Sequence, residues 1–404
     1  MKLHWIALSV VSGLTCSAFA QDPLPFFIDF EEPTYSTTGN GGGGILYNGT
    51  TGQGNWSGGG AYSISADQAW RGSQSLKFRT DIAYPIAGTT FSARKRNVAV
   101  NTGIMVADGY IYIHNDPDGR AAFAIEMWAN NYVNRMASIG FSDTGQAALR
   151  RRSDFGPELV AANAPFGSDR WIHATVVYDI GRNVMYGYAD NQTLVDGAGQ
   201  PLAFSITDLT NFNFDNLGLG GFLGGNNRTA FGVPAGELRG RDFAYFDDLR
   251  MNNYATGVME AKVNLLDFSV STEGQAVTVE ILDASDTVIE TLPGTVDANG
   301  YVTVAPTSRG QLKVRVKASH WLAKKIDPVW ITDTGVYHLV FDLINGDVDG
   351  DNEVGGSDLS EVSTAFLSAD GDPNFNPMAD LDGDGEVGSS DLSILSTNFL
   401  LTGD

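Results

Sequence analysis

The sequence is nearly free of cysteine: its 404 residues contain one, Cys16. Cys16 lies within the first twenty residues, which we interpret below as a removable leader, so we expect no disulfide in the mature chain. A secreted chain of this length without disulfides must rely on large apolar cores or on bound metal. Histidine is also scarce. His173, His320 and His338 stand far apart in the sequence, which argues against a histidine-rich metal cluster.

Positive charge is scarce as well. The chain has 25 Lys and Arg against 48 Asp and Glu, for a net charge of −23. Nothing in this balance favours binding to nucleic acid or to an anionic membrane. The last sixty residues account for much of the excess, because they hold eleven Asp, three Glu and no Lys or Arg. We therefore interpret the acidity mainly as that of a metal-binding tail.

Long apolar runs are missing too. The apolar stretch at residues 5–14 has only about half the length that a membrane-spanning helix needs. Lys2 precedes it and Ala18-Phe19-Ala20 follows it, so residues 1–20 are predicted to be a secretory signal peptide with an Ala-x-Ala cleavage site. We expect a secreted protein, extracellular or associated with the cell surface, without a membrane span.

The last sixty residues contain the same unit twice. Residues 346–366 read GDVDGDNEVGGSDLSEVSTAF and residues 379–399 read ADLDGDGEVGSSDLSILSTNF. Each unit has carboxylates at loop positions one, three and five and an acid at position twelve, which is the spacing of an EF-hand calcium loop. A hard cation with six to eight oxygen ligands needs alternate side chains turned inward, and position seven contributes its backbone carbonyl. The predicted ligands are Asp347, Asp349, Asp351, Glu353 and Asp358 in the first loop, and Asp380, Asp382, Asp384, Glu386 and Asp391 in the second.

The units differ from ordinary EF-hands because position twelve is Asp and no helical pattern precedes either loop. A helix is predicted after each loop, from apolar residues at helical spacing: Leu359, Val362 and Phe366, then Leu392, Leu395 and Phe399. Val354 and Val387, at position eight, are expected to pair the loops back to back. Position six requires a left-handed backbone, which Gly385 and the Asn352 of the first loop can both adopt.

This order of loop, helix, linker, loop and helix over residues 345–404 resembles a type I dockerin. The resemblance implies two bound Ca²⁺ ions and a cohesin-like module as partner, on a scaffold that carries polysaccharide-acting proteins. It also implies that loop positions ten and eleven contact the partner, which here are Gly356, Ser357, Ser389 and Ser390. Because the unit is duplicated, we expect two near-equivalent faces and docking in either of two orientations. We further expect residues 345–404 to fold only with calcium.

Residues 21–256 show short strand patterns separated by Gly, Asn and Asp, and no long helical period. The clearest strands are predicted at residues 26–30, 62–65, 75–78, 110–114, 123–128, 171–178, 185–189 and 243–251. Residues 29–31, 72–76, 171–179 and 246–249 carry a resemblance to the concanavalin A-like lectin/glucanase (LamG-like) jelly roll. Four acids near the first and last strands leave two alternatives open, exposed turn carboxylates or a structural calcium site: Asp29, Glu31, Asp247 and Asp248.

Glycosidases of this fold carry paired carboxylates on one strand, as Glu-x-Asp-x-x-Glu, because the reaction needs an acid and a nucleophile about 5 Å apart. The nearest candidate, residues 125–130, offers Glu126 alone, so we expect no hydrolysis. Sugar binding through aromatic rings and Asn side chains is favoured instead. The ligand candidates are Trp56 and Trp70 in Gly-rich surroundings, and Asn130 and Tyr132 after a strand. Trp128 and Trp171, within strands, are expected in the core.

Residues 259–342 are predicted to form a second β unit of about seven short strands, with a hairpin turn at Asn299-Gly300. This unit looks like an immunoglobulin-like or carboxypeptidase-regulatory-like module. The predicted fold class is therefore mostly β, a large jelly roll and a small sandwich followed by a small helical dockerin. Three functions stay open: a non-catalytic carbohydrate-recognition or adhesion protein attached through its dockerin, a polysaccharide-degrading glycoside hydrolase, or a purely structural extracellular protein.

Overall fold

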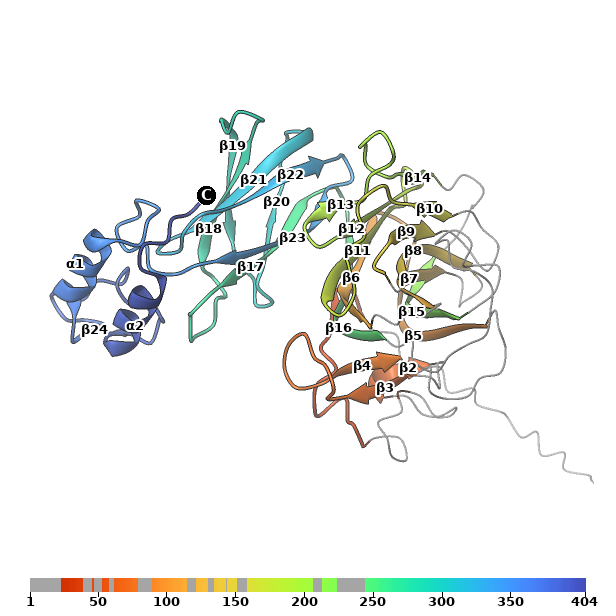
Figure 1. Cartoon of the computed structure of the whole chain (residues 1–404), viewed down its shortest axis with the longest axis horizontal. Helices are drawn as coiled ribbons and strands as arrows, with labels where there is room; N and C mark the ends of the chain where they lie inside the picture. Colours follow the sequence, from red (N-terminus) through yellow and green to blue (C-terminus); the bar gives the residue numbers. More distant parts are fainter. Residues whose placement is uncertain are drawn as a thin grey trace, which may run out of the picture.

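The computed structural model describes residues 23–38, 46, 53–57, 62–78, 89–114, 121–129, 134–142, 144–150, 158–205, 213–223 and 244–404. The predicted signal peptide at residues 1–20 and the predicted ligand residues Asn130 and Tyr132 lie outside these ranges. Figure 1 shows two β units in a row, with a small helical unit at the far end.

The N-terminal unit consists of two antiparallel sheets. The first runs in the order β13-β12-β11-β6-β16-β4-β3, with β1 added to β16 and β14 added to β12. Its strands are β1 (Phe26–Ile28), β3 (Tyr62–Ser65), β4 (Ser75–Phe78), β6 (Ile104–Ile113), β11 (Trp171–Asp179), β12 (Val184–Ala189), β13 (Gln192–Thr193), β14 (Phe204–Ser205) and β16 (Ala244–Tyr254).

The second sheet runs β10-β9-β8-β7-β15-β5-β2. Its strands are β2 (Trp56–Ser57), β5 (Thr89–Val100), β7 (Ala121–Ala129), β8 (Asn134–Ser142), β9 (Ala147–Arg150), β10 (Glu158–Val160) and β15 (Phe214–Leu223), and a single turn of 3₁₀ helix, η1 (Gln53–Asn55), precedes β2. Alternate residues of both sheets point into one shared core, as on β6, where Met105, Ala107 and Ile111 are buried in it. The first and last strands of the unit pair, with Phe26 opposite Met251.

The second β unit is a smaller sandwich. Its strands are β17 (Met259–Leu265), β18 (Ala276–Leu282), β19 (Val288–Thr295), β20 (Tyr301–Val304), β21 (Gly310–Ala318), β22 (Lys324–Ile331) and β23 (Val336–Leu343). They form sheets of order β20-β17-β23 and β19-β18-β21-β22, around a core of their own. The expected turn before β20 is present: the Asp297 carboxylate accepts the Asn299 and Tyr301 N–H groups, and Gly300 has a φ of 79°.

The C-terminal unit contains α1 (Gly356–Ala365), α2 (Ser389–Asn398) and the short strands β24 (Ser368–Ala369) and β25 (Glu386–Val387). The expected pairing of Val354 with Val387 is wrong. Val354 exchanges hydrogen bonds with residues 400 and 401, after α2, while Val387 pairs with Ser368, after α1. The physical reason lies at the helix ends, where Leu367 and Leu400 adopt φ values of 64° and 69° and turn the chain back onto the loop of the other repeat.

The helical unit packs directly on the small sandwich. Leu322 of the sandwich belongs to the apolar cluster between the two helices. The Asp404 N–H donates to the Ala323 carbonyl, and the Asp404 carboxylate forms an ion pair with Lys324. The C-terminus therefore returns to the sandwich (Figure 1). The architecture confirms the predicted fold class, which is mostly β with a small helical tail.

Candidate metal centre and ligand surfaces

The carboxylates at positions one, three and five come together in each C-terminal loop. Asp347, Asp349 and Asp351 place ligand oxygens within 4.8 Å of one another, and so do the three equivalent residues of the second loop, Asp380, Asp382 and Asp384. Each loop is bent by its own side chains. The Asp349 carboxylate accepts the Asp351 N–H at 3.1 Å, and the Asp351 carboxylate accepts the Glu353 N–H at 2.9 Å. Asp382, Asp384 and Glu386 repeat both bonds at the same lengths.

Backbone conformation keeps both loops tight. Position six is left-handed in each, with φ of 71° at Asn352 and 91° at Gly385, as expected from the sequence. Position four is left-handed as well, at Gly350 and Gly383. Glycine and asparagine adopt this conformation at least cost, which explains the choice of residues at these positions.

The position-twelve residues close the loops from inside. Asp358 is fully buried, and its carboxylate accepts the N–H groups of Val348, Asp349 and Gly355 at 2.7, 3.1 and 2.6 Å. Asp391 makes the equivalent three bonds in the second loop. Neither carboxylate belongs to the groups whose ligand oxygens, at positions one, three and five, lie within 4.8 Å of one another. The Glu353 and Glu386 side chains are exposed and do not belong to the two carboxylate groups.

The donor set fits a hard cation. The described ligands are all oxygens, the atoms that Ca²⁺ prefers. One oxygen of Asp347 is buried without a hydrogen-bond partner, while the other accepts from the Lys317 ammonium of the small sandwich. In the second loop, burial raises the pKa of Asp380, and the nearby Asp391 and Asp384 carboxylates raise it further. A bound cation would satisfy the free oxygen and offset this crowding of negative charge.

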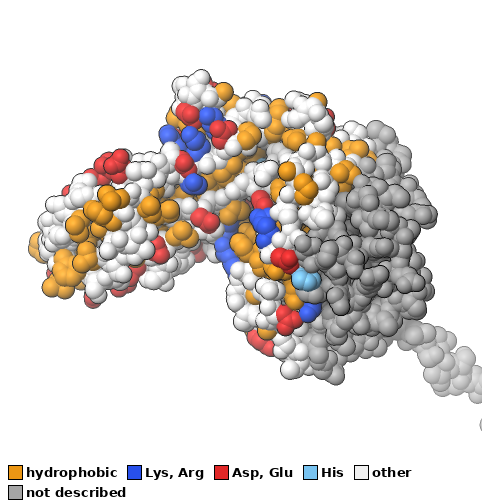
Figure 2. Space-filling view, viewed as in Figure 1, with side chains coloured by type: hydrophobic (Ala, Val, Ile, Leu, Met, Phe, Trp, Pro, Cys, Tyr) orange, Lys and Arg blue, Asp and Glu red, His pale blue; other side chains and the backbone are white. Residues whose placement is uncertain are grey.

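The predicted partner residues Gly356, Ser357, Ser389 and Ser390 are all exposed, in the first turns of α1 and α2. Sequence reasoning did not find the apolar surface beside them. Of the three apolar residues spaced along each helix, only Val362 and Leu395 are buried. The others are exposed in matching pairs: Leu359 and Leu392 (38% and 37%), Phe366 and Phe399 (38% and 39%), and the adjacent Leu367 and Leu400 (83% and 78%). Figure 2 shows hydrophobic side chains gathered on the surface of this unit.

The prediction that Trp56 binds a ligand is wrong, because its side chain is not on the surface. It is fully buried in the jelly-roll core, with its ring near Phe30 and its indole N–H donating to the Tyr35 hydroxyl at 3.2 Å. Its strand, β2, lies at the edge of the second sheet, and its side chain points into the core that the two sheets share. Trp70, by contrast, is 39% exposed and stacks on Tyr110, with ring centroids 4.2 Å apart and planes 15° apart.

Trp70 is one member of an aromatic strip on the outer face of the first sheet. Trp171, which we expected in the core, is only half-buried and packs against Trp70 and Tyr112. Tyr112 packs in turn against Tyr245. The strand register explains the strip, because Trp171, Tyr112 and Tyr245 lie directly opposite one another on β11, β6 and β16. We use "aromatic strip" for Trp70, Tyr110, Tyr112, Trp171 and Tyr245.

Glu126 is buried on β7, and its carboxylate accepts the Trp128 indole N–H at 2.8 Å. The residues directly opposite it on β15 and β8 are Gly218 and Ser138, so neither position supplies a second carboxylate. Of the four acids at the first and last strands, Glu31 accepts the Ser73 and Gln74 N–H groups, and Asp247 accepts those of Trp70, Arg71 and Asp248. No three of these four acids form a group of converging carboxylates like those of the C-terminal loops, and a calcium site at these strands stays a prediction.

Residues 345–400 match the family model of the Dockerin type I domain. No curated protein sequence matches the chain. Among the described residues, no helix is long and apolar enough to cross a membrane.

Solved structures resemble parts of the chain. A mutant type II cohesin–X–dockerin complex from Acetivibrio cellulolyticus is 21% identical over 36% of this chain and 97% of that chain, with a TM-score of 0.32. An endo-1,3-beta-glucanase from Streptomyces sioyaensis is 14% identical over 56% of this chain and 94% of that chain, with a TM-score of 0.34. An endo-beta-1,4-glucuronan lyase from the fungus Trichoderma reesei is 10% identical over 57% of this chain and 95% of that chain, with a TM-score of 0.35.

Proposed function

We propose that this chain, whose residues 345–400 match a type I dockerin, is a secreted protein that is attached through its tail to a cohesin-like module and presents a glycan-binding jelly roll. The observation that carries the proposal is the repeated loop, in which three carboxylates converge twice with the same internal hydrogen bonds. We assign residues 21–256 to the jelly roll, 259–342 to the small sandwich and 345–404 to the dockerin.

Calcium is assigned to both loops, with one ion in each. Asp347, Asp349 and Asp351 would supply side-chain oxygens, Glu353 its backbone carbonyl, and Asp358 the closing carboxylate. The second loop would use its equivalent residues, Asp380, Asp382, Asp384, Glu386 and Asp391. The ion would supply the positive charge that holds these carboxylates together, while Asp358 ties the loop to the start of α1 through its bond to Gly355.

The partner surface consists of two faces of similar composition, one on each helix. Each combines an exposed pair at positions ten and eleven, in the first turn of the helix, with an exposed leucine on the helix and an exposed phenylalanine directly after it. Exposed apolar residues beside polar positions are typical of protein interfaces. Because both faces have the same composition, the partner would bind through either one.

The test of docking is calorimetric titration of the full chain with purified cohesin modules, in calcium and in chelator. Changing Ser389 and Ser390 to Ala and Leu392 to Asp would leave binding nearly intact through the other face. Adding the matched changes Gly356→Ala, Ser357→Ala and Leu359→Asp would abolish it. Loss of all binding from the first set alone would refute the two-face arrangement, and equal binding in chelator would refute the calcium dependence.

Glycan recognition is assigned to the aromatic strip rather than to the predicted Trp56. Trp70 is exposed and Tyr112 and Trp171 are half-buried, so the strip presents indole and phenol rings on which sugar rings can stack. Affinity electrophoresis in gels of soluble polysaccharides would show retardation that Trp70→Ala removes. The matched control is Trp330→Ala, a half-buried tryptophan on β22 of the small sandwich. Retardation that is equal in wild type and Trp70→Ala would refute the strip as the binding face.

The proposed role is non-catalytic, because the positions directly opposite Glu126 hold no second carboxylate. The check is an assay for reducing-sugar release by the full chain on the polysaccharides that it binds. Release of reducing sugar that Glu126→Gln abolishes would replace this proposal with a glycoside hydrolase.

A further inference from the structure

We propose that the junction between the two β sandwiches is a second ligand site, a pocket that takes the terminal sugar residue of a glycan chain lying on the aromatic strip. This inference rests on the glycan binding proposed above and names where a chain end is recognised. The pocket has a volume of about 240 Å³ and is built from both units. The jelly roll contributes Arg71, Tyr110 and His173, and the small sandwich contributes Lys262, Asn299 and Tyr301.

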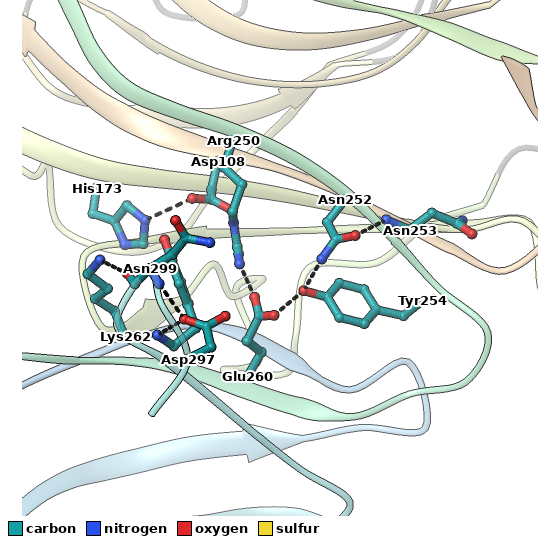
Figure 3. Close-up of polar contacts among 11 residues, drawn as sticks. Asp108, His173, Arg250, Asn252, Asn253, Tyr254, Glu260, Lys262, Asp297 and Asn299 are labelled. Carbon is teal, nitrogen blue, oxygen red and sulfur yellow. Dashed lines mark hydrogen bonds and ion pairs between the residues drawn. The ribbon is translucent and has the colours of Figure 1, made fainter. Parts of the chain in front are cut away.

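The two walls of the pocket are held together by a buried ion network, shown in Figure 3. Arg250, on the last strand of the jelly roll, is fully buried and binds the Asp108 carboxylate at 2.6 Å. The Nη1 atom of the same guanidinium forms an ion pair with Glu260, on the first strand of the small sandwich. Tyr254 donates to the second oxygen of Glu260. The pocket is therefore pre-formed, which lowers the cost of ordering it around a ligand.

One polar group of the pocket wall is left without a partner. The Nε2 atom of His173 lies 3.5 Å from the Asp108 carboxylate, whereas its Nδ1 atom is buried and has no hydrogen-bond partner. The His173 residue is only 8% exposed. A buried polar atom without a partner costs free energy, and a ligand hydroxyl would remove that cost.

The pocket has room for a sugar ring. At about 30 Å³ for each water molecule, the cavity has the volume of roughly eight waters, enough for one pyranose ring. A pyranose needs an aromatic face for its C–H groups and both donors and acceptors for its hydroxyls. Phe27, which lines the pocket and is exposed, offers a ring, Arg71 and Lys262 donate, and Asp248 accepts.

The cations and acids of the pocket favour a neutral polyol over a small ion. Arg71 lies 3.7 Å from Asp248, so positive and negative charges largely offset each other. Burial, together with the nearby Arg71 guanidinium, lowers the pKa of Lys262 to about 8. Its ammonium donates to the Asn299 carbonyl and is poorly solvated, so further hydroxyl contacts would stabilise it.

Tyr110 connects the pocket to the aromatic strip. It lines the pocket, and its ring lies between Trp70, stacked at 4.2 Å, and His173, stacked at 4.8 Å. The strip and the pocket therefore share Tyr110, which places the pocket beside the strip. The arrangement predicts that chain ends bind more tightly than chain interiors.

The test uses calcium-loaded full chain and calorimetric titration with four probes: cellohexaose, xylohexaose, mannohexaose and laminarihexaose. Arg71→Met removes a donor of the pocket, and its matched control is Arg309→Met, which removes a guanidinium that is also partly exposed and ion-paired to one Asp. Val340→Trp fills the cavity, and its control is Val288→Trp on the exposed edge strand β19. For at least one probe we expect both pocket variants to weaken binding tenfold or more, and both controls to stay within twofold of wild type.

The outcomes separate this inference from the proposed function. If Trp70→Ala abolishes binding while both pocket variants match wild type, the pocket is refuted and the strip stands. If wild type binds none of the four probes, the pocket is refuted as a recognition site for neutral chain ends, and polysaccharide retardation then decides the strip independently. Thermal melting of each variant must stay near that of its control, since a general loss of folding would lower binding and melting temperature together.

Discussion

The Arg250→Met substitution tests how far one buried cation holds the two sandwiches together. Arg250 contacts Asp108 of its own sheet and Glu260 of the small sandwich, and its side chain is 2% exposed. Methionine has a similar length and would fill the space, so the substitution removes charge with little loss of packing. It leaves Asp108 and Glu260 buried without their counter-ion.

The expected cost follows from that loss. Removing one partner of a buried ion pair destabilises a protein by about 3–5 kcal/mol, because an uncompensated charge remains in the interior. A surface pair is worth about 0–1 kcal/mol, so Arg309→Met, which breaks an exposed pair with Asp333, is the control. Adding Asp108→Asn and Glu260→Gln to Arg250→Met would recover much of the lost stability, because no uncompensated carboxylate then remains in the interior.

The assay is urea unfolding in calcium buffer, followed by circular dichroism. With an m-value of about 2 kcal/mol per molar, the midpoint of the transition that includes the junction would fall by roughly 1.5–2.5 M for Arg250→Met. Arg309→Met would shift it by less than about 0.5 M. If the two variants shift the midpoint equally, the network does not stabilise the junction and the reasoning fails.

Three further predictions concern protonation and metal. Burial lowers the pKa of His338 to about 3, so the folded state holds fewer protons than the unfolded state below pH 6.5, and this group lowers stability as the pH drops. In urea unfolding at pH 8 and pH 5, the change in stability between the two pH values would differ by about 2 kcal/mol between wild type and His338→Phe, because the contributions of His320 and Asp247 are common to both; an equal change in the two proteins would contradict this cause. In chelator, residues 345–404 would show little helix by circular dichroism, and they would gain helix on addition of calcium. The reason is that few apolar side chains are buried to offset the entropy lost in ordering the loops. Identical spectra with and without calcium would mean that the tail folds without metal. Asp391→Ala would reduce the bound calcium from two ions to one in a titration of the full chain, whereas Asp370→Ala, outside both loops, would retain two; equal stoichiometry in both variants would contradict the assignment of position twelve.

Local patterns in the sequence were sufficient for the loops and for most strands. The three carboxylates of each loop lie within five residues of one another, so their spacing alone places them around one point, and Asn352 and Gly385 adopt the expected left-handed backbone. The strands at residues 62–65 and 75–78 were located to the residue, because alternation along a strand is visible without knowledge of its partners.

Local sequence patterns did not reveal which way a side chain points or which distant segments of the chain pair. Trp56 and Trp70 have similar Gly-rich surroundings in the sequence, yet one fills the core and the other lies on the surface, since the difference depends on which sheet face each adjoins. Val354 and Val387 looked like partners by symmetry, but each pairs with the segment that leaves the other helix. Both side chains lie in one apolar cluster, so matching positions in a repeat do not reveal which backbone segments pair.

The sequence by itself determined the composition of the acidic loops, the mostly β character of the chain, and the order of its three units. Only the tertiary structure decided that Tyr110 meets Trp70, that Arg250 binds Glu260, and that a pocket lies between the sandwiches. The physical reason is the range of the interactions. A calcium loop is specified by neighbours along the chain, whereas the strip and the pocket arise from the register of strands far apart in sequence and from the packing of one sandwich on the other.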